Sequence, residues 1–221
     1  MKEKKKYVSL IVLDLSTFVL MILGITFSIC DVRFMVDYPR LSTLHILMTF
    51  TGLSNVFIGL VCLATAIYRI IKKDTKLNKI LFLLKIIALA DITITFVVTA
   101  TYLAPHLGAD WWRLYINNNI FNHFLTPILA ITTFIVLEDY VELDYRYCFL
   151  SVVPLLLYGV MYVINVYTHL KPDGSTDLAY DIYGFCRFGV GFLILFLIGF
   201  VAISIGLTLL YRFINKQRNK L

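Results

Sequence analysis

The chain has 221 residues, of which 60% are hydrophobic and 15% are charged, and its formal net charge is +6. Soluble domains contain about 45–50% apolar and about 25% charged residues, so this chain has too few polar side chains to cover a water-soluble globule. The composition therefore excludes a soluble enzyme, a disordered chain and a disulfide-stapled secreted domain. Together with a mean hydropathy of +0.83, it predicts an all-α polytopic membrane protein.

Six stretches are long and apolar enough to cross a bilayer, which takes about 20 residues in a helix. They are residues 7–29, 45–68, 79–103, 118–137, 148–168 and 185–212. The segments between them are polar and contain the helix breakers Pro39, Pro105 and Pro172. Strands of a β-barrel would instead be alternating segments of about 10 residues. The sequence predicts one six-helix transmembrane domain over residues 1–221.

The distribution of Lys and Arg predicts the orientation of this bundle. Fourteen of these residues lie in the tails and loops on the side of the termini, and five lie in the opposite loops. Because positively charged loops tend to stay in the cytoplasm, both termini are expected to be cytoplasmic and the plasma membrane is the expected location. A nucleic-acid partner would need a basic face on a soluble domain, and none is expected.

The four cysteines show no metal-binding spacing, since the sequence has neither C-x-x-C nor paired histidines. No metal or other cofactor is therefore expected. Cys30 and Cys186 both fall near the outer ends of predicted spans, so a disulfide between them is geometrically possible. Free buried thiols are the favoured interpretation.

Two charged residues, Asp14 and Lys85, are predicted in the inner half of the membrane. A rise of 1.5 Å per residue places them about 6 Å and about 9 Å inward of the middle of their spans. Both spans run outward, so the two side chains can meet and avoid two isolated charges in hydrocarbon. In the alternative, Lys85 extends to the cytoplasmic interface and water or hydroxyls bind Asp14.

A third charge, Asp91, is predicted near the membrane midplane. It begins a polar stripe at helical spacing that continues through Thr95 and Thr99 to Tyr102. Asn55 on the second span has nearly the same depth, so an Asp91–Asn55 contact is expected. The pair is either part of a proton relay or a polar contact that joins two helices.

A hydroxyl and an imidazole are predicted at nearly one depth in the outer half of the membrane. Thr51 lies about 9 Å and His123 about 7 Å outward of the centre. Pro127 is expected to loosen the helix at His123, because it lacks an N–H donor and crowds the preceding turn. A neutral imidazole beside a hydroxyl is the minimum for base-assisted nucleophilic attack, although a lone intramembrane histidine can simply be a packing residue.

Two motifs in these spans resemble a known family. Phe50-Thr51-x-x-Ser54-Asn55 on the second span and His123-x-x-x-Pro127 on the fourth are similar to the F-T-x-x-S-N and H-x-x-x-P motifs of small bacterial six-helix membrane proteins. That group resembles the androgen-induced family of animal integral-membrane hydrolases, which cleave fatty-acid esters of hydroxy fatty acids. The resemblance implies that Thr51 is the nucleophile and His123 is its base.

The predicted activity is hydrolysis of a membrane-dissolved lipid ester. Asn55, Ser54 or Asn119 would donate to the oxyanion, and Asn119 would also orient the imidazole. Arg187 would hold a substrate carboxylate or would simply extend to the membrane interface. The stripe that ends at Tyr102 would admit water, and Tyr102 would also contact the substrate. Asp181 and Tyr183, in the last outer loop, would cover the mouth of the site or remain solvated.

Three alternatives stay open at this point. A transacylase would use the same residues but pass the acyl group to another alcohol. A transporter or channel would use Asp14, Lys85 and Asp91 as a charge path, although the sequence has no inverted repeat. A non-catalytic lipid-binding or scaffold protein would use Thr51, Ser54, Asn55 and His123 only to join helices.

Overall fold

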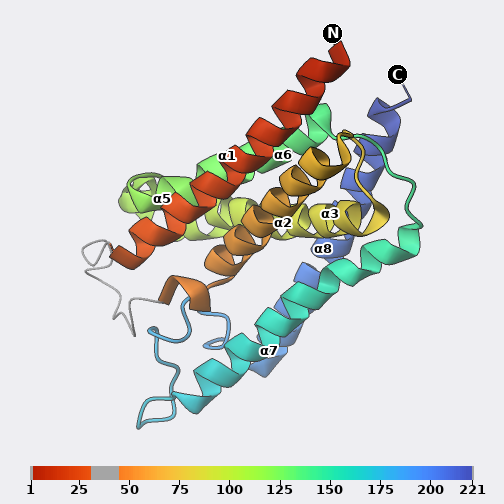
Figure 1. Ribbon diagram of the computed structural model, residues 1–221. Coiled ribbons are helices and arrows are strands. Elements are labelled where there is room, and N and C mark those ends of the chain that lie inside the picture. The colour runs from red at the N-terminus through yellow and green to blue at the C-terminus, as the bar shows by residue number, and fades with distance from the viewer. Residues whose placement is uncertain (1, 31–44, 221) are drawn as a thin grey trace.

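The structure is a computed structural model that describes residues 2–30 and 45–220. In these residues it is all-α and contains six helical runs long and apolar enough to cross a membrane (Figure 1). The runs are Glu3–Cys30, Phe50–Lys72, Lys79–His106, Asn118–Leu137, Tyr145–Thr168 and Val190–Arg218. The prediction of a multi-pass integral membrane protein with six spans is confirmed.

The first two spans are uninterrupted helices, α1 (Lys2–Cys30) and α2 (Phe50–Lys72). α2 begins five residues later than the predicted start at residue 45, because a separate turn, η1 (His45–Met48), precedes it. Thr49 then caps α2, and its side-chain oxygen accepts a hydrogen bond from the backbone N–H of Gly52 at 2.9 Å.

The third and fourth spans each change helix type along their length. The third consists of α3 (Lys79–Val98), the π-helical segment η2 (Thr99–Leu103) and α4 (Ala104–His106). A 3₁₀ turn, η3 (Gly108–Tyr115), leads to the fourth span. That span consists of α5 (Asn118–Ile120), the π-helical segment η4 (Phe121–Leu125) and α6 (Thr126–Leu137).

The last two spans enclose a structured loop. The fifth span is η5 (Tyr145–Ser151) followed by α7 (Val152–Thr168), and the sixth is α8 (Val190–Arg218). The predicted start of the sixth span at residue 185 is wrong by five residues. Residues 185–189 belong to the loop instead, where Gly189 has a φ of 85° that side-chain-bearing residues rarely adopt.

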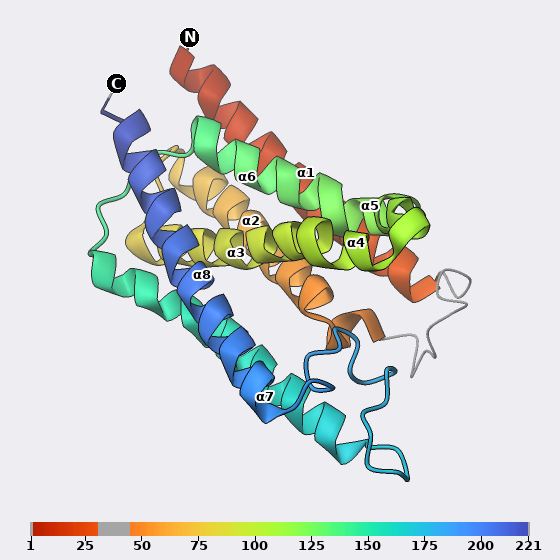
Figure 2. The same ribbon diagram turned by 180° about the vertical axis from the view of Figure 1, so that it is seen from behind.

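α3 is the central helix of the bundle. In its most apolar window 67% of the residues are buried, against 11% in α8, so α8 has the larger lipid-facing surface. α2 and α6 pack against α3 on one side, with α1 across both of them, and α7 and α8 run together on the other side (Figures 1 and 2). Away from the chain termini the α7–α8 pair diverges from the other helices.

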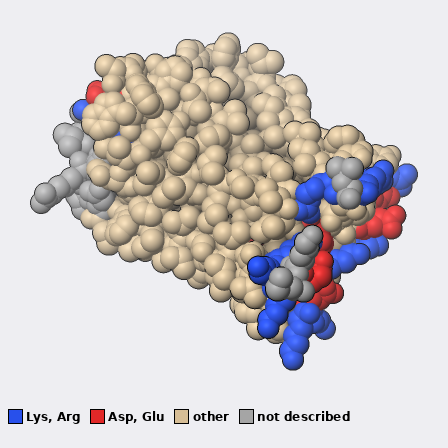
Figure 3. All heavy atoms as spheres, turned by 90° about the horizontal axis from the view of Figure 1, so that it is seen from above, with Lys and Arg blue, Asp and Glu red and all other residues tan. Residues whose placement is uncertain are grey.

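Both described chain ends lie at the same end of the bundle, which we call the terminal end (Figure 1). The last turns of α2 and α8 contribute Lys72, Lys216 and Arg218 there. On the face seen in Figure 3, charged side chains gather in one region and most of the remaining surface carries none. A broad uncharged surface of this kind is what a protein embedded in lipid requires.

Candidate functional site

His123 is hydrogen bonded to a threonine, but not to the predicted one. Its Nδ1 lies 2.8 Å from the Oγ1 of Thr99, and both residues are buried. Among the described residues, this is the hydrogen bond that the imidazole makes. The predicted pairing of His123 with Thr51 is therefore not formed, and Thr99, assigned only to a polar stripe, is the hydroxyl beside the imidazole.

The two π-helical segments account for this pairing. Thr99 is the first residue of η2, and His123 lies in the middle of η4. Pro105 and Pro127 follow these segments and have no N–H to continue the regular hydrogen-bond ladder. The local distortion expected at His123 is thus present. A π segment also rotates the residues after it around the helix axis, and such segments are common at functional sites.

Polar side chains of α1 and α2 hold the η4 segment in place. Asn55 Nδ2 donates to the carbonyl of Asn122 at 3.0 Å, and Asn122 Nδ2 donates to Ser28 Oγ at 3.0 Å. Asn55 Nδ2 also lies 2.8 Å from the carbonyl of Thr51. Asn55 therefore joins the beginning of α2 to the residue next to His123, rather than contacting Asp91 as predicted.

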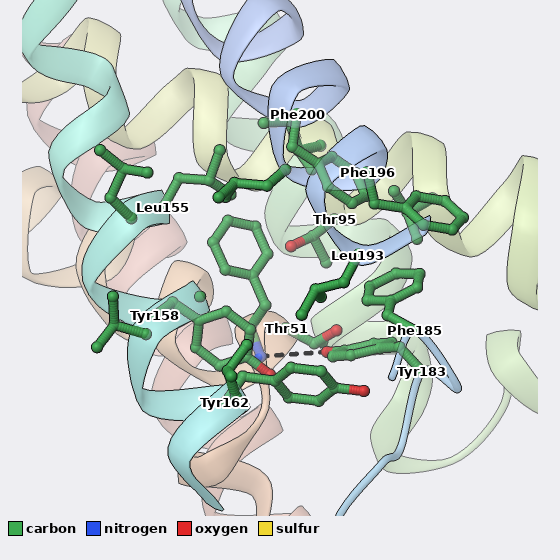
Figure 4. A pocket seen from close by; sticks show the side chains of 18 of the residues that line it. Thr51, Thr95, Leu155, Tyr158, Tyr162, Tyr183, Phe185, Leu193, Phe196 and Phe200 are labelled. Carbon is green, nitrogen blue, oxygen red and sulfur yellow. Dashed lines mark hydrogen bonds between the residues drawn. The ribbon is translucent and has the colours of Figure 1, made fainter. Parts of the chain in front are cut away.

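Thr99 lines a cavity of about 320 Å³ between α3, α7 and α8. The cavity is mostly apolar, and its hydroxyl-bearing lining residues are Thr51, Thr95, Thr99, Tyr158, Tyr162 and Tyr183. Figure 4 labels all of these except Thr99. Val160 of α7 and Ile194 of α8 also line it and are 60% and 52% exposed. The cavity consequently reaches the lipid-facing surface, while its polar groups lie deeper.

Thr51 lies in this cavity beside the phenol of Tyr183 (Figure 4). The Tyr183 oxygen accepts a hydrogen bond from the backbone N–H of Phe50 at 3.1 Å, and the hydroxyls of Thr51 and Tyr158 are its neighbours in the cavity. Burial raises the pKa of Tyr183, and the phenol is therefore neutral at physiological pH. Thr51 and Tyr183 together place two adjacent hydroxyls in the lining of the cavity.

A buried carboxylate, Asp181, organises the loop before α8 that contains Tyr183. Asp181 accepts hydrogen bonds from the Tyr162 hydroxyl, from the Cys186 N–H at 3.3 Å and from the Arg187 N–H at 3.0 Å. Asp181 and Tyr183 are both buried, so neither is the solvated loop residue considered above. Tyr183 lines the cavity, whereas Asp181 is buried in the loop and is not part of the lining.

The other predicted site residues lie apart from the imidazole. Ser54 Oγ is 2.7 Å from Thr95 Oγ1 and 3.1 Å from the Thr51 carbonyl. Asn119 does not orient His123, because its amide donates to the Arg113 carbonyl at 3.1 Å.

The two residues predicted to contact substrate are also placed differently. The Tyr102 hydroxyl donates to the Tyr183 carbonyl at 3.1 Å and braces the loop. Arg187 is exposed, with its guanidinium 4.7 Å from the centre of the Phe188 ring. Arg187 is not in the cavity lining, so a role in holding a substrate carboxylate gains no support from its position.

A buried cluster of four charges joins the helices near the terminal end. Lys85 Nζ lies 2.8 Å from Asp14 Oδ1 and 2.7 Å from Glu138 Oε2, and Arg69 contacts both carboxylates. The expected Asp14–Lys85 contact is thus present. Sequence reasoning missed the other two members: Arg69 was counted among the loop charges, and Glu138 follows the predicted end of its span.

The structure has all four cysteines as free thiols, and Cys186 is buried as expected, but Cys30 is exposed, so the expectation of a buried thiol is wrong for Cys30. Cys186 is buried, and burial together with the nearby Asp181 carboxylate raises the pKa of its thiol to about 11. In the described part of the chain, no group of three or more His, Cys, Asp or Glu residues is arranged to hold a metal.

These environments predict selective alkylation of the native protein. At pH 8, a maleimide should modify exposed Cys30 and leave Cys186 intact, because a buried thiol with a raised pKa supplies little thiolate. Peptide mass spectrometry after a timed reaction measures this. Unfolding in SDS should expose all four thiols, and equal native rates at Cys30 and Cys186 would contradict the burial of the loop.

Comparison with protein-family models, curated proteins and solved structures finds no match for this chain. The resemblance to six-helix threonine hydrolases therefore depends on the two short motifs alone. The functional assignment has to come from the geometry of the site.

Proposed function

We propose that this membrane protein hydrolyses a lipid ester, with Thr99 as nucleophile and His123 as its base. One observation carries the proposal: Thr99, which lines a largely apolar cavity, places its Oγ1 2.8 Å from the Nδ1 of His123, which lies behind that lining. A hydroxyl within hydrogen-bond reach of an imidazole is the arrangement that base-assisted attack requires.

The proposed first step forms an acyl-threonine. With the imidazole proton on Nε2, the Thr99 hydroxyl donates to Nδ1 and its oxygen attacks the ester carbonyl carbon. The proton passes to Nδ1, and the tetrahedral intermediate then expels the alcohol, which takes that proton. In the second step water attacks the acyl group, His123 removes its proton, and release of the acid returns the proton to Thr99.

Thr51 and Tyr183 are suited to stabilise the oxyanion of both steps. The Tyr183 phenol accepts the Phe50 N–H, and in this proposal its O–H donates to the oxyanion. A donor of this kind typically lowers the activation free energy by about 2.7–4 kcal/mol. The motif threonine thus remains part of the proposed site, but as a neighbour of the oxyanion rather than as the nucleophile.

The cavity favours a substrate that carries a long acyl chain. Its apolar lining and its contact with the lipid-facing surfaces of α7 and α8 would let a chain enter directly from the bilayer. Thr99 is 20 residues beyond Lys79, about 30 Å along the helix, and so lies far from the terminal end. If the termini are cytoplasmic, as the charge distribution predicts, hydrolysis takes place in the outer half of the membrane.

The proposal predicts the position of a covalent adduct. A fluorophosphonate with a long alkyl chain should modify Thr99 of the purified protein, and Thr99→Ala should abolish the reaction while the protein still elutes as a folded peak. Thr101→Ala is the matched control, since this exposed threonine in the same π segment donates only to the Val97 carbonyl. An adduct on Thr51, or labelling that survives Thr99→Ala, would overturn the assignment of the nucleophile.

A further inference from the structure

Asp91 is a buried acid for which the described residues supply no ion-pair or hydrogen-bond partner. It is 1% exposed, it forms no ion pair among the described residues, and its Oδ1 has no hydrogen-bond partner there. The other two carboxylates buried within the spans or at their ends, Asp14 and Glu138, are each bound by two cationic side chains. An unpaired carboxylate at such a position is costly unless something else compensates its charge.

Asp91 lines a second cavity, of about 230 Å³, between α2, α3 and α7. Three aromatic side chains, Phe50, Phe57 and Tyr158, line the same space, and the Phe50 and Tyr158 rings lie 5.3 Å apart. Aromatic faces attract cations through the negative potential above the ring. A carboxylate among three aromatic rings is therefore a recognition site for a positively charged group.

The second cavity is reached from the lipid side of the protein. Leu157 and Met161 of α7 belong to its lining and are 68% and 47% exposed. A ligand would thus enter between helices from the hydrocarbon region, which requires an apolar chain attached to the charged group. Asp91 does not line the cavity of Thr99, although Phe50 and Tyr158 belong to both linings.

We infer that this second cavity binds an ammonium group carried on a hydrocarbon chain, with Asp91 as the counter-ion and the three rings around the cation. The cation supplies the charge that no side chain supplies to Asp91, and the chain extends past α7 toward the lipid. This binding site is independent of the proposed hydrolysis, because neither Thr99 nor His123 takes part in it.

The inference is tested by binding measurements on the full chain in micelles of uncharged dodecyl maltoside. Dodecyltrimethylammonium should raise the melting temperature in a saturable manner, and dodecanol should not. Asp91→Asn, which keeps the shape of the side chain, should weaken ammonium binding at least about tenfold, a difference of about 1.4 kcal/mol. Glu142→Gln removes one exposed acid and is the matched control, so it should leave the affinity unchanged.

A measurement on the unmodified chain covers the case in which Asp91→Asn does not fold. Dicyclohexylcarbodiimide attaches to protonated carboxyls in apolar surroundings, and the quaternary ammonium has no N–H to react with it. Dodecyltrimethylammonium should protect Asp91 from this reagent, whereas dodecanol should not. Equal effects of the two probes, unchanged affinity in Asp91→Asn, or labelling of Asp91 that the ammonium leaves unaffected would each overturn the inference.

Discussion

Replacing Lys85 with Met is expected to destabilise the folded protein by about 3–5 kcal/mol. Lys85 is 1% exposed and binds both Asp14 and Glu138, which with Arg69 form a cluster of zero net charge. Met fills a similar volume but leaves two carboxylates with one cation in a buried site. Equilibrium unfolding of the purified protein in SDS–maltoside mixtures measures the free energy difference.

Two further variants separate charge from side-chain volume. Lys79→Met removes an exposed lysine at the start of the same helix and should change the unfolding free energy by less than about 0.5 kcal/mol. Adding Asp14→Asn to Lys85→Met returns the cluster to zero net charge and should recover part of the lost stability. A Lys85→Met protein as stable as the original would show that the cluster contributes nothing to folding.

His123→Gln is expected to reduce hydrolysis by about 100- to 10,000-fold, the usual contribution of a general base. The amide can still hydrogen bond to Thr99 but cannot take its proton, so the fold should persist while the chemistry stops. Release of p-nitrophenol from a medium-chain ester measures the rate, and the unfolding midpoint checks the fold.

The control for this change is His169→Gln. His169 is exposed and stacks on Tyr180 with ring centres 4.0 Å apart, outside the cavity lining. It should keep the original rate. If His123→Gln hydrolyses the ester as fast as the unchanged protein, His123 is a packing residue and the hydrolase proposal fails. That result would not affect the proposed ammonium site at Asp91, which the binding measurements test separately.

The site shows why motif spacing did not identify the threonine that lies beside His123. Regular helices place Thr51 and His123 at one depth, and that estimate needs only the rise per residue. Which side chain meets the imidazole depends on the rotation of each helix about its axis, and two π segments change this rotation at Thr99 and His123. Pro127 indicated a distortion, but not the direction in which the imidazole would turn.

In the charged cluster, too, the sequence identified only some of the residues that the structure brings together. Asp14 and Lys85 were found from the sequence because each interrupts a long apolar run. Arg69 and Glu138 were not identified from the sequence. Both directly follow the predicted end of a span, where a charged residue is expected in a solvated loop. Their burial results from the packing of α1, α2, α3 and α6 around them.

By itself the sequence determined the number of spans and their approximate bounds, because crossing hydrocarbon demands about 20 consecutive apolar residues and this is a local property. It also identified the polar residues that lie within the membrane. Only the tertiary structure decided their partners. Thr99 rather than Thr51 lies beside His123, and two basic residues surround each of Asp14 and Glu138. Asp91 has no partner among residues 2–30 and 45–220. Contacts between helices depend on crossing angles and axial rotation, and no short stretch of sequence encodes either of them.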